Sequence, residues 1–261
     1  MSLHDPTERA RRGAQGQSEI LGAAAREPET LMQSSWRDYV FAEVWTRPGL
    51  DRRSRFFISI CAAVCNGGRA DVAEGYIRGA LKLGEITLVE MREAALQLAV
   101  YGGWPRGVAL DAAVTRVADE LGLAPAAYRP IRAQPWDPAE RLAEGAAHFK
   151  SVMIFPAPPP LTPYLEGGIV NFVFGEVWMR PGLDQRARRW ITLVGVADSS
   201  AMTPIRTHAY AAMASGNATP EEMQEFVLQY AVDGSWPKAS VMQAVVSELG
   251  DRVAKGLPYP W

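Results

Sequence analysis

The sequence is poor in the residues that mark several common protein classes. Its 261 residues include two cysteines, Cys61 and Cys65, and three histidines. Two cysteines are too few for a disulfide-stapled secreted domain, so we expect a cytoplasmic location. Their i, i+4 spacing places both on one face of a helix, where they are best interpreted as small apolar core residues.

Excess basic charge and long apolar runs are also lacking. The formal net charge is −2, which leaves no surplus of Lys and Arg for a nucleic-acid surface. No apolar stretch is long enough to span a bilayer, and the polar N-terminal segment has no signal-peptide core. We therefore expect neither a nucleic-acid nor a membrane partner.

One sequence motif occurs twice in the chain. Residues 43–51 read Glu-Val-Trp-Thr-Arg-Pro-Gly-Leu-Asp, and residues 176–184 read Glu-Val-Trp-Met-Arg-Pro-Gly-Leu-Asp. The offset of 133 residues persists to Arg55 and Arg188. Because this period is too long for a solenoid repeat, it indicates two tandem copies of one domain.

Both copies carry strong helix signals. Asp51 and Asp184 stand at N-cap positions, and Thr87 and Thr219 each begin a capping box. The apolar run 56–64 is bounded by polar residues and approaches helix length, so we interpret it as a buried helix. No segment alternates with period two for long, and the sequence therefore predicts an all-α fold.

Composition divides the chain into four parts. We expect an N-terminal helical extension over 1–35 and a first domain over 36–122. A proline-rich linker with one helix is expected over 123–164, and a second domain over 165–261. Prolines prevent a long helix in the first part of the linker.

The copies differ at one position of chemical interest. Tyr76 in the first copy stands where His208 stands in the second. We expect Thr203 to be the N-cap of that helix and Pro204 its first residue, which places His208 in the second turn. Histidine can give and take a proton near neutral pH.

Together these sequence motifs resemble those of the carboxymuconolactone decarboxylase family, part of the alkylhydroperoxidase D-like superfamily. The resemblance covers about residues 36–121 and 165–250. It implies all-helical domains, decarboxylation of a carboxylated lactone without a cofactor, and assembly into a homo-oligomer. For two fused domains the implied assembly is a homotrimer.

The resemblance also implies that His208 is the proton-transfer residue. Glu176 is a candidate acid–base partner, or a group that orients His208. The alternative is a structural ion pair, because Glu176 and Glu43 precede Arg180 and Arg47 by four residues.

Three arginines, Arg186, Arg188 and Arg189, follow the Asp184 cap and are candidates for binding a substrate carboxylate. We select Arg188 because Arg55 repeats it in the first copy.

Arg180, Trp178 and Tyr76 complete the substrate-binding candidates. Core packing is the alternative for Trp178. The Tyr76 phenol is a hydrogen-bond donor in the copy that lacks histidine.

The leading hypothesis is a carboxy-lyase acting on a small carboxylated lactone or a related intermediate of aromatic-compound degradation. The alternatives are an isomerase, cyclase or hydrolase acting on another small carboxylic acid in the same pocket, or a non-catalytic ligand-binding homologue. The redox branch of the superfamily uses a Cys-x-x-Cys-x-x-x-His motif, but Ala201 and Pro204 occupy the two cysteine positions before His208. We therefore predict that the protein is not a cysteine-dependent peroxidase.

Overall fold

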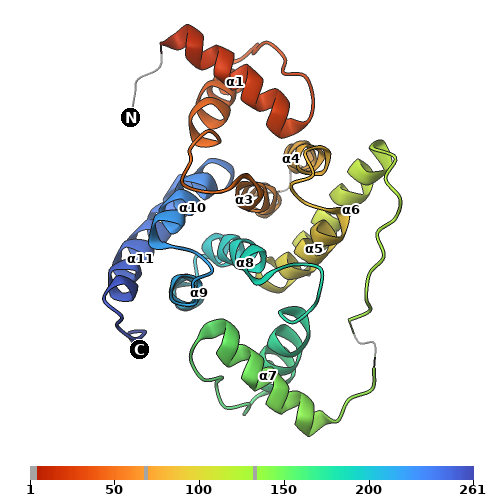
Figure 1. Cartoon of the computed structure of the whole chain (residues 1–261), viewed down its shortest axis with the longest axis vertical. Helices are drawn as coiled ribbons and strands as arrows, with labels where there is room; N and C mark the ends of the chain where they lie inside the picture. The colour runs from red at the N-terminus through yellow and green to blue at the C-terminus, as the bar shows by residue number, and fades with distance from the viewer. Residues whose placement is uncertain (1–4, 68–69, 132–133) are drawn as a thin grey trace.

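The computed structural model describes residues 5–67, 70–131 and 134–261, drawn in Figure 1. Across these residues the regular structure is helical and contains no strand, which confirms the predicted all-α fold. The described residues up to 131 are called the first half, and residues 134–261 the second half. The first half holds α1 (Pro6–Leu21), α2 (Leu31–Ser35), η1 (Trp36–Val44), α3 (Arg52–Cys65), α4 (Ala70–Lys82), α5 (Leu88–Gly102) and α6 (Trp104–Glu120). The second half holds α7 (Pro138–Met153), η2 (Tyr164–Val177), α8 (Gln185–Ser199), α9 (Met202–Ala214), α10 (Pro220–Asp233) and α11 (Trp236–Ala254).

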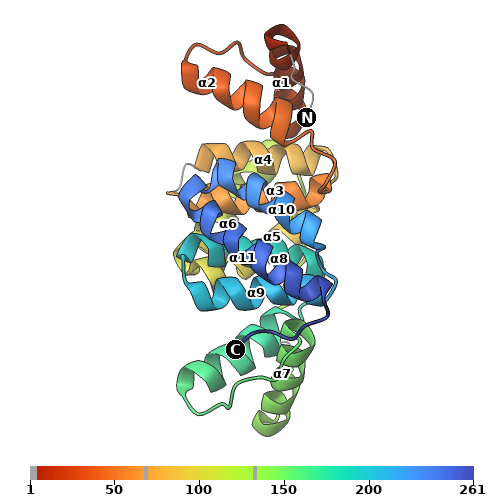
Figure 2. The same cartoon turned by 90° about the vertical axis from the view of Figure 1, so that its left-hand side faces the viewer.

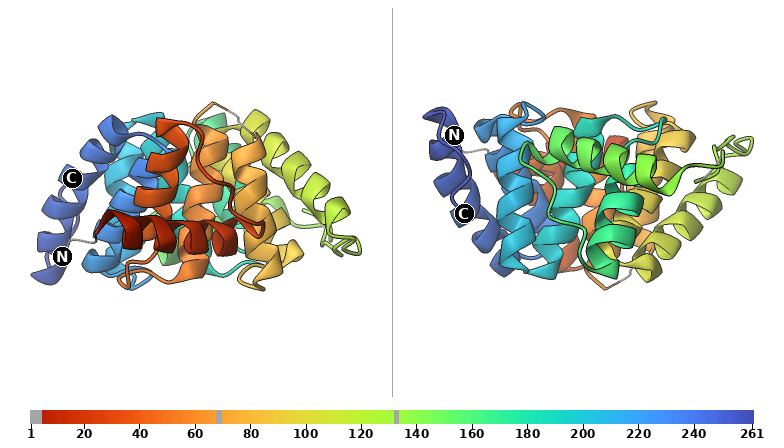
Figure 3. Two further views of the ribbon diagram at one scale, coloured as in Figure 1. Left: turned by 90° about the horizontal axis from the view of Figure 1, so that it is seen from above. Right: turned by 90° about the horizontal axis from the view of Figure 1, so that it is seen from below.

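The two halves share one body. Helices α3 and α8 pack against each other at its centre, while α1 and α7 lie at opposite ends (Figures 1 and 2). Seen from above and from below, α1 and α7 each lie across the helices beneath them (Figure 3). One hydrophobic core contains residues of both halves. The central helices of the two halves are therefore not separately packed units.

Most helix starts follow the sequence signals. The side chains of Asp51 and Asp184 accept hydrogen bonds from the first turns of α3 and α8, which confirms both N-caps. Reciprocal capping boxes at Thr87 and Thr219 begin α5 and α10 as predicted. These bonds satisfy N–H groups that have no partner within the helix.

The predicted start of α9 is wrong by two residues. The helix begins at Met202 after Ala201, which gives no side-chain cap, and Thr203 lies inside the first turn. Pro204 is tolerated there because the first N–H groups of a helix have no internal acceptor in any case. His208 still falls in the second turn.

The segments η1 and η2 have π-helical hydrogen bonding. The N–H of Trp45 donates to the carbonyl of Val40, and that of Trp178 to Val173, each at 3.0 Å. This five-residue spacing gives a wider turn than the α-helix. Trp45 and Trp178 of the repeated motif are the C-cap residues of η1 and η2.

Helices α1 and α7 dock on η1 and η2 in the same manner. Arg9 of α1 pairs with Glu43 at 2.6 Å, and Arg141 of α7 pairs with Glu176. The two helices lie in the stretches that the sequence assigns to the extension 1–35 and the linker 123–164. The domain boundaries stay a prediction, but the packing gives each half an equivalent outer helix.

None of the described helices combines the length and the apolar character needed to cross a bilayer.

Candidate active site

His208 lies on α9 with 6% of its surface exposed, and it lines a cavity of about 380 Å³. The walls come from the end of α5, from α7 and η2, and from α8 and α9. The cavity-lining residues are Val100, Tyr101, Phe149, Met153, Phe155, Tyr164, Gly168, Ile169, Val173, Phe174, Val196, Ser199, Pro204, Thr207 and His208.

Tyr101 is the first half's main contribution to this cavity. Its ring meets the imidazole of His208 edge to face, with ring centroids 5.1 Å apart. The indole Nε1 of Trp178 donates to the Tyr101 hydroxyl at 2.8 Å, which fixes the phenol in place. The cavity is therefore a joint product of both halves, although the histidine comes from only one.

The imidazole of His208 is neutral in the empty cavity. Burial, followed by the positive charge of Arg189, lowers the pKa of His208 to about 3. Within the described ranges, Nδ1 of His208 has no hydrogen-bond partner. A buried polar atom without a partner is costly, so this nitrogen is available to a ligand.

Arg189 is the sequence candidate that we did not select. It is fully buried on α8, and its Nε donates to Asn217 Oδ1 at 3.1 Å while another guanidinium nitrogen donates to the carbonyl of Val152. Among the described residues no carboxylate pairs with it. Burial lowers the pKa of Arg189 to about 10, so the guanidinium remains positively charged at neutral pH.

Arg189 lies directly behind the cavity wall. A guanidinium nitrogen stands 3.8 Å from the sulfur of Met153, and the group stacks over the Trp178 ring at 4.9 Å. Arg189 was one of three candidates in the sequence. The signal that could have selected it is a difference between the copies, because the matching residue of the first copy is Phe56.

Arg188, which we selected from sequence, is in a different place. It is fully buried, does not line the cavity, and donates to Glu93 at 3.3 Å and Gln97 at 3.1 Å. Arg180 also lies outside the cavity and pairs with Glu93 at 2.7 Å. Glu93 therefore engages both of these substrate-binding candidates away from the cavity.

The predicted four-residue ion pairs are also wrong. Glu176 pairs with Arg141 rather than Arg180, and Arg47 pairs with Glu225 at 2.6 Å. The spacing rule requires both residues on one α-helix, whereas η2 is π-helical and ends before Arg180. Glu176 is not among the residues that line the His208 cavity.

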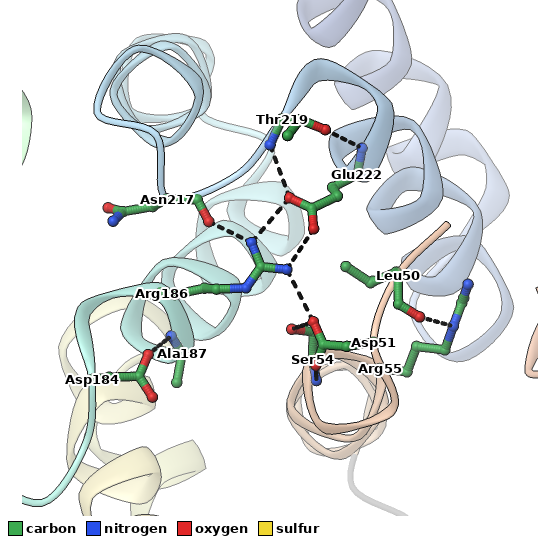
Figure 4. Close-up of polar contacts among 10 residues, drawn as sticks. All are labelled: Leu50, Asp51, Ser54, Arg55, Asp184, Arg186, Ala187, Asn217, Thr219 and Glu222. Atoms are coloured by element: carbon green, nitrogen blue, oxygen red, sulfur yellow. Dashed lines mark hydrogen bonds and ion pairs between the residues drawn. The ribbon is translucent and has the colours of Figure 1, made fainter. Parts of the chain in front are cut away.

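Arg186, the third candidate, joins the two halves. Its guanidinium donates to Glu222 at 2.8 Å and to Asp51 at 2.9 Å, as Figure 4 shows. It also donates to the carbonyl of Asn217 at 2.6 Å. With these acceptors in place, Arg186 serves to fasten α8 to α10 and to the start of α3.

Comparisons with known proteins identify relatives of this chain. The sequence model of the carboxymuconolactone decarboxylase family matches residues 31–116. A 4-carboxymuconolactone decarboxylase from Acinetobacter baylyi is 30% identical over 126 residues, covering 45% of this chain and 92% of that protein. The chain belongs to the carboxymuconolactone decarboxylase family. A nitrosuccinic acid decarboxylase from Metarhizium robertsii is 39% identical over 69 residues, covering 26% of this chain and 46% of that protein.

The residues matched by the carboxymuconolactone decarboxylase family model lie in the half where tyrosine stands at the position that matches His208. There Tyr76 is fully buried, and its hydroxyl donates to Asp233 at 3.0 Å. The ring stacks on Trp45 with centroids 5.5 Å apart. Tyr76 therefore fills the position that matches His208 and does not reach the His208 cavity.

Trp178 supports the cavity from behind. It is buried, lies parallel to Phe174 with ring centroids 6.0 Å apart, and does not itself line the cavity. Its contacts with Tyr101 and Arg189 hold both residues in position.

The cysteines of this family member are buried core residues. Burial raises the pKa of Cys61 well above its usual range and that of Cys65 to about 12. Within the described ranges, no group of three or more His, Cys, Asp or Glu side chains lies together as a metal site would require.

Proposed function

We propose that the protein is a decarboxylase that removes carbon dioxide from a small carboxylated lactone, or from a related intermediate of aromatic-compound degradation, without a cofactor. His208 transfers the proton. The observation that carries this proposal is the neutral imidazole that lines an apolar cavity, in front of a buried arginine with no described carboxylate partner. The two relatives named as decarboxylases support the reaction class.

The reaction needs little from the protein beyond a proton and a suitable environment. The bond between the lactone skeleton and the carboxylate carbon breaks, carbon dioxide leaves, and the electron pair moves into the conjugated carbonyl as an enolate. A proton then adds to carbon. An apolar cavity favours this step, because it disfavours the localised carboxylate more than the charge-dispersed transition state.

His208 obtains the required proton when the substrate binds. An anion placed beside the imidazole favours its charged form and so raises the low pKa of the empty site. The imidazole takes up a proton from water, gives it to the enolate carbon, and returns to its neutral form. Arg189 supplies the positive field that draws the anion in and stabilises the enolate oxygen.

The decisive experiment measures carbon dioxide released by the wild-type protein and by His208→Gln, from 4-carboxymuconolactone and from lactones that carry a single carboxylate. Glutamine keeps the polar volume but transfers no proton, so we expect a loss in kcat of about 10²- to 10⁴-fold. Tyr76→Phe is the matched control at the corresponding position of the first half, and its rate should stay near wild type.

The product distinguishes the alternative functions. An altered lactone without carbon dioxide would indicate an isomerase, cyclase or hydrolase. Binding without any product would indicate a ligand-binding homologue. Equal rates for wild type and His208→Gln would remove this histidine from the mechanism.

The assembly is proposed on family grounds. We propose a homo-oligomer, with the homotrimer expected for two fused domains. Sedimentation equilibrium of the full chain tests it, and a monomeric mass at micromolar concentration would contradict it.

A further inference from the structure

The walls of the His208 cavity carry very little charge. Among the described residues, no Lys, Arg, Asp or Glu lines it. Its surface is mostly aromatic and aliphatic, and the aromatic members are Tyr101, Phe149, Phe155, Tyr164 and Phe174. A ligand in this space therefore exchanges water for ring faces and methyl groups over most of its surface.

One wall is held firmly by aromatic packing. Phe155 meets Trp261 with ring centroids 5.0 Å apart and Tyr259 at 5.9 Å. Tyr210 holds this tail in turn, because its hydroxyl donates to the carbonyl of Leu257 at 3.0 Å. The apolar wall is thus braced from behind, which leaves little freedom for it to move aside and admit a polar partner.

One arginine near the cavity has no carboxylate partner among the described residues. Arg188 shares Glu93 with Arg180, and Arg186 pairs with Glu222 and Asp51, and none of these three arginines lines the cavity. Arg189 has no described carboxylate partner, and it stands behind Met153 next to His208. The site is therefore built to balance one negative charge.

We propose that the cavity takes a monocarboxylate with an apolar ring or chain, and that it discriminates against dicarboxylates. This inference rests on the proposed function, because it specifies the substrate class of the same site. Nitrosuccinic acid and 4-carboxymuconolactone are both dicarboxylic acids, so the natural substrate of this chain differs from the compounds for which its relatives are named.

The discrimination follows from desolvation. The first carboxylate is placed against His208 and the field of Arg189. A second carboxylate on the same small molecule would lie against Phe149, Phe155 or Phe174, where no cation balances it. Burying an unpaired ion is strongly unfavourable, and protonating it to avoid the burial also lowers affinity at neutral pH.

Benzoate and terephthalate form a matched pair of unreactive probes, because they share the ring and differ by one carboxylate. Isothermal titration calorimetry of the full chain at neutral pH should show benzoate binding at least about tenfold more tightly, a difference of about 1.4 kcal/mol. Neutral benzamide measures the contribution of the apolar walls alone.

Two variants locate the preference. Arg189→Met should weaken benzoate binding about tenfold or more while leaving benzamide binding nearly unchanged. Ile169→Arg adds a cation to the wall and should improve terephthalate binding relative to benzoate. This second variant retains Arg189, so it keeps the test decisive even if Arg189→Met does not fold.

The outcomes separate this inference from the proposed function. Terephthalate binding as tightly as benzoate, or neither probe binding, would overturn the inference. A preference for benzoate without carbon dioxide release from any acid would uphold the ligand class and reject the decarboxylase. Carbon dioxide release from dicarboxylates as efficient as from monocarboxylates would uphold the decarboxylase and reject the ligand class.

Discussion

The two halves keep the same ionic framework and differ where the cavity lies. In one framework Glu225 of α10 bridges Arg47 and Arg55 at 2.6 and 3.1 Å. In the other, Glu93 of α5 bridges Arg180 and Arg188 at 2.7 and 3.3 Å. Each network joins residues from opposite halves, so the repeated arginines hold the halves together.

Two of the positions that differ between the halves lie at the cavity or directly behind its wall. Where the second half has His208 and Arg189, the first has Tyr76 and Phe56. Tyr101 of the first half and Asp233 of the second half also occupy matching positions. Tyr101 lines the cavity, whereas Asp233 accepts a hydrogen bond from Tyr76. The repeated arginines thus belong to the ionic framework, whereas His208 and Arg189, which are not repeated, belong to the candidate site.

The packing of α1 on α4 helps to explain why the region around Tyr76, which matches the His208 position, is closely packed. A Cβ at Gly79 of α4 would overlap the carbonyl oxygen of Ile20, so α1 lies directly on α4 there. The corresponding residue of α9 is Ala211, and Thr207 replaces Gly75 one turn earlier. At this position α7 packs against α9 with Ala211 between them, and Thr207 lines the cavity beside that contact.

The largest expected effect comes from breaking one framework. Glu93→Ala leaves Arg180 and Arg188 without their carboxylate, and Glu225→Ala does the same to Arg47 and Arg55. We expect each to reduce the free energy of unfolding by about 3–5 kcal/mol in urea denaturation. Glu248→Ala, which breaks an exposed pair with Arg206, is the control and should cost at most about 1 kcal/mol. Losses no larger than in this control would refute the framework role.

We expect Arg189 to increase turnover while lowering the free energy of unfolding. Arg189→Met removes a buried charge that has no described carboxylate partner, so we expect turnover to fall about 100-fold while unfolding stability stays equal or rises. Phe56→Met at the matching position should leave turnover unchanged and reduce stability. Carbon dioxide release and thermal unfolding measured together check both variants, and a wild-type rate in Arg189→Met would contradict the role of the charge.

The close contact at Gly79 can be tested by adding one methyl group. Gly79→Ala forces α1 away from α4, and we expect it to reduce unfolding stability by about 1–3 kcal/mol in spite of alanine's better helix propensity. Ala211→Gly is the control and should lose only about 1 kcal/mol. A more stable Gly79→Ala protein would show that α1 is not held by this contact.

Anion binding should depend on pH through His208. The empty site has a pKa of about 3, and a bound anion raises it, so binding takes up a proton between these two values. Benzoate affinity should therefore fall by up to about tenfold for each unit that pH rises above about 5, until the pKa of the complex is passed. Calorimetry in buffers of different ionisation enthalpy measures the proton uptake directly. His208→Gln should abolish it, and its persistence there would assign the proton to another group.

The smallest expected effect is at Tyr76. Tyr76→Phe removes the hydrogen bond to Asp233, and we expect a loss of about 1 kcal/mol in unfolding stability with turnover unchanged. A large fall in turnover would show that the first half takes a direct part in catalysis.

The sequence by itself determined the local structure. The caps at Asp51, Asp184, Thr87 and Thr219 depend on neighbours within three residues, and so they could be predicted. The position of His208 in the second turn of its helix was also evident, although the true helix start at Met202 was not.

Only the tertiary structure decided the partners of the charged residues and the place of the cavity. Arg180 meets a glutamate 87 residues away and Arg47 one 178 residues away, and no periodic pattern encodes such a pairing. The choice between Arg188 and Arg189 depended on which face of α8 turns toward α5 and which toward α7. Local bonds form between near neighbours in the chain, whereas ion pairs and cavities depend on which helices pack side by side.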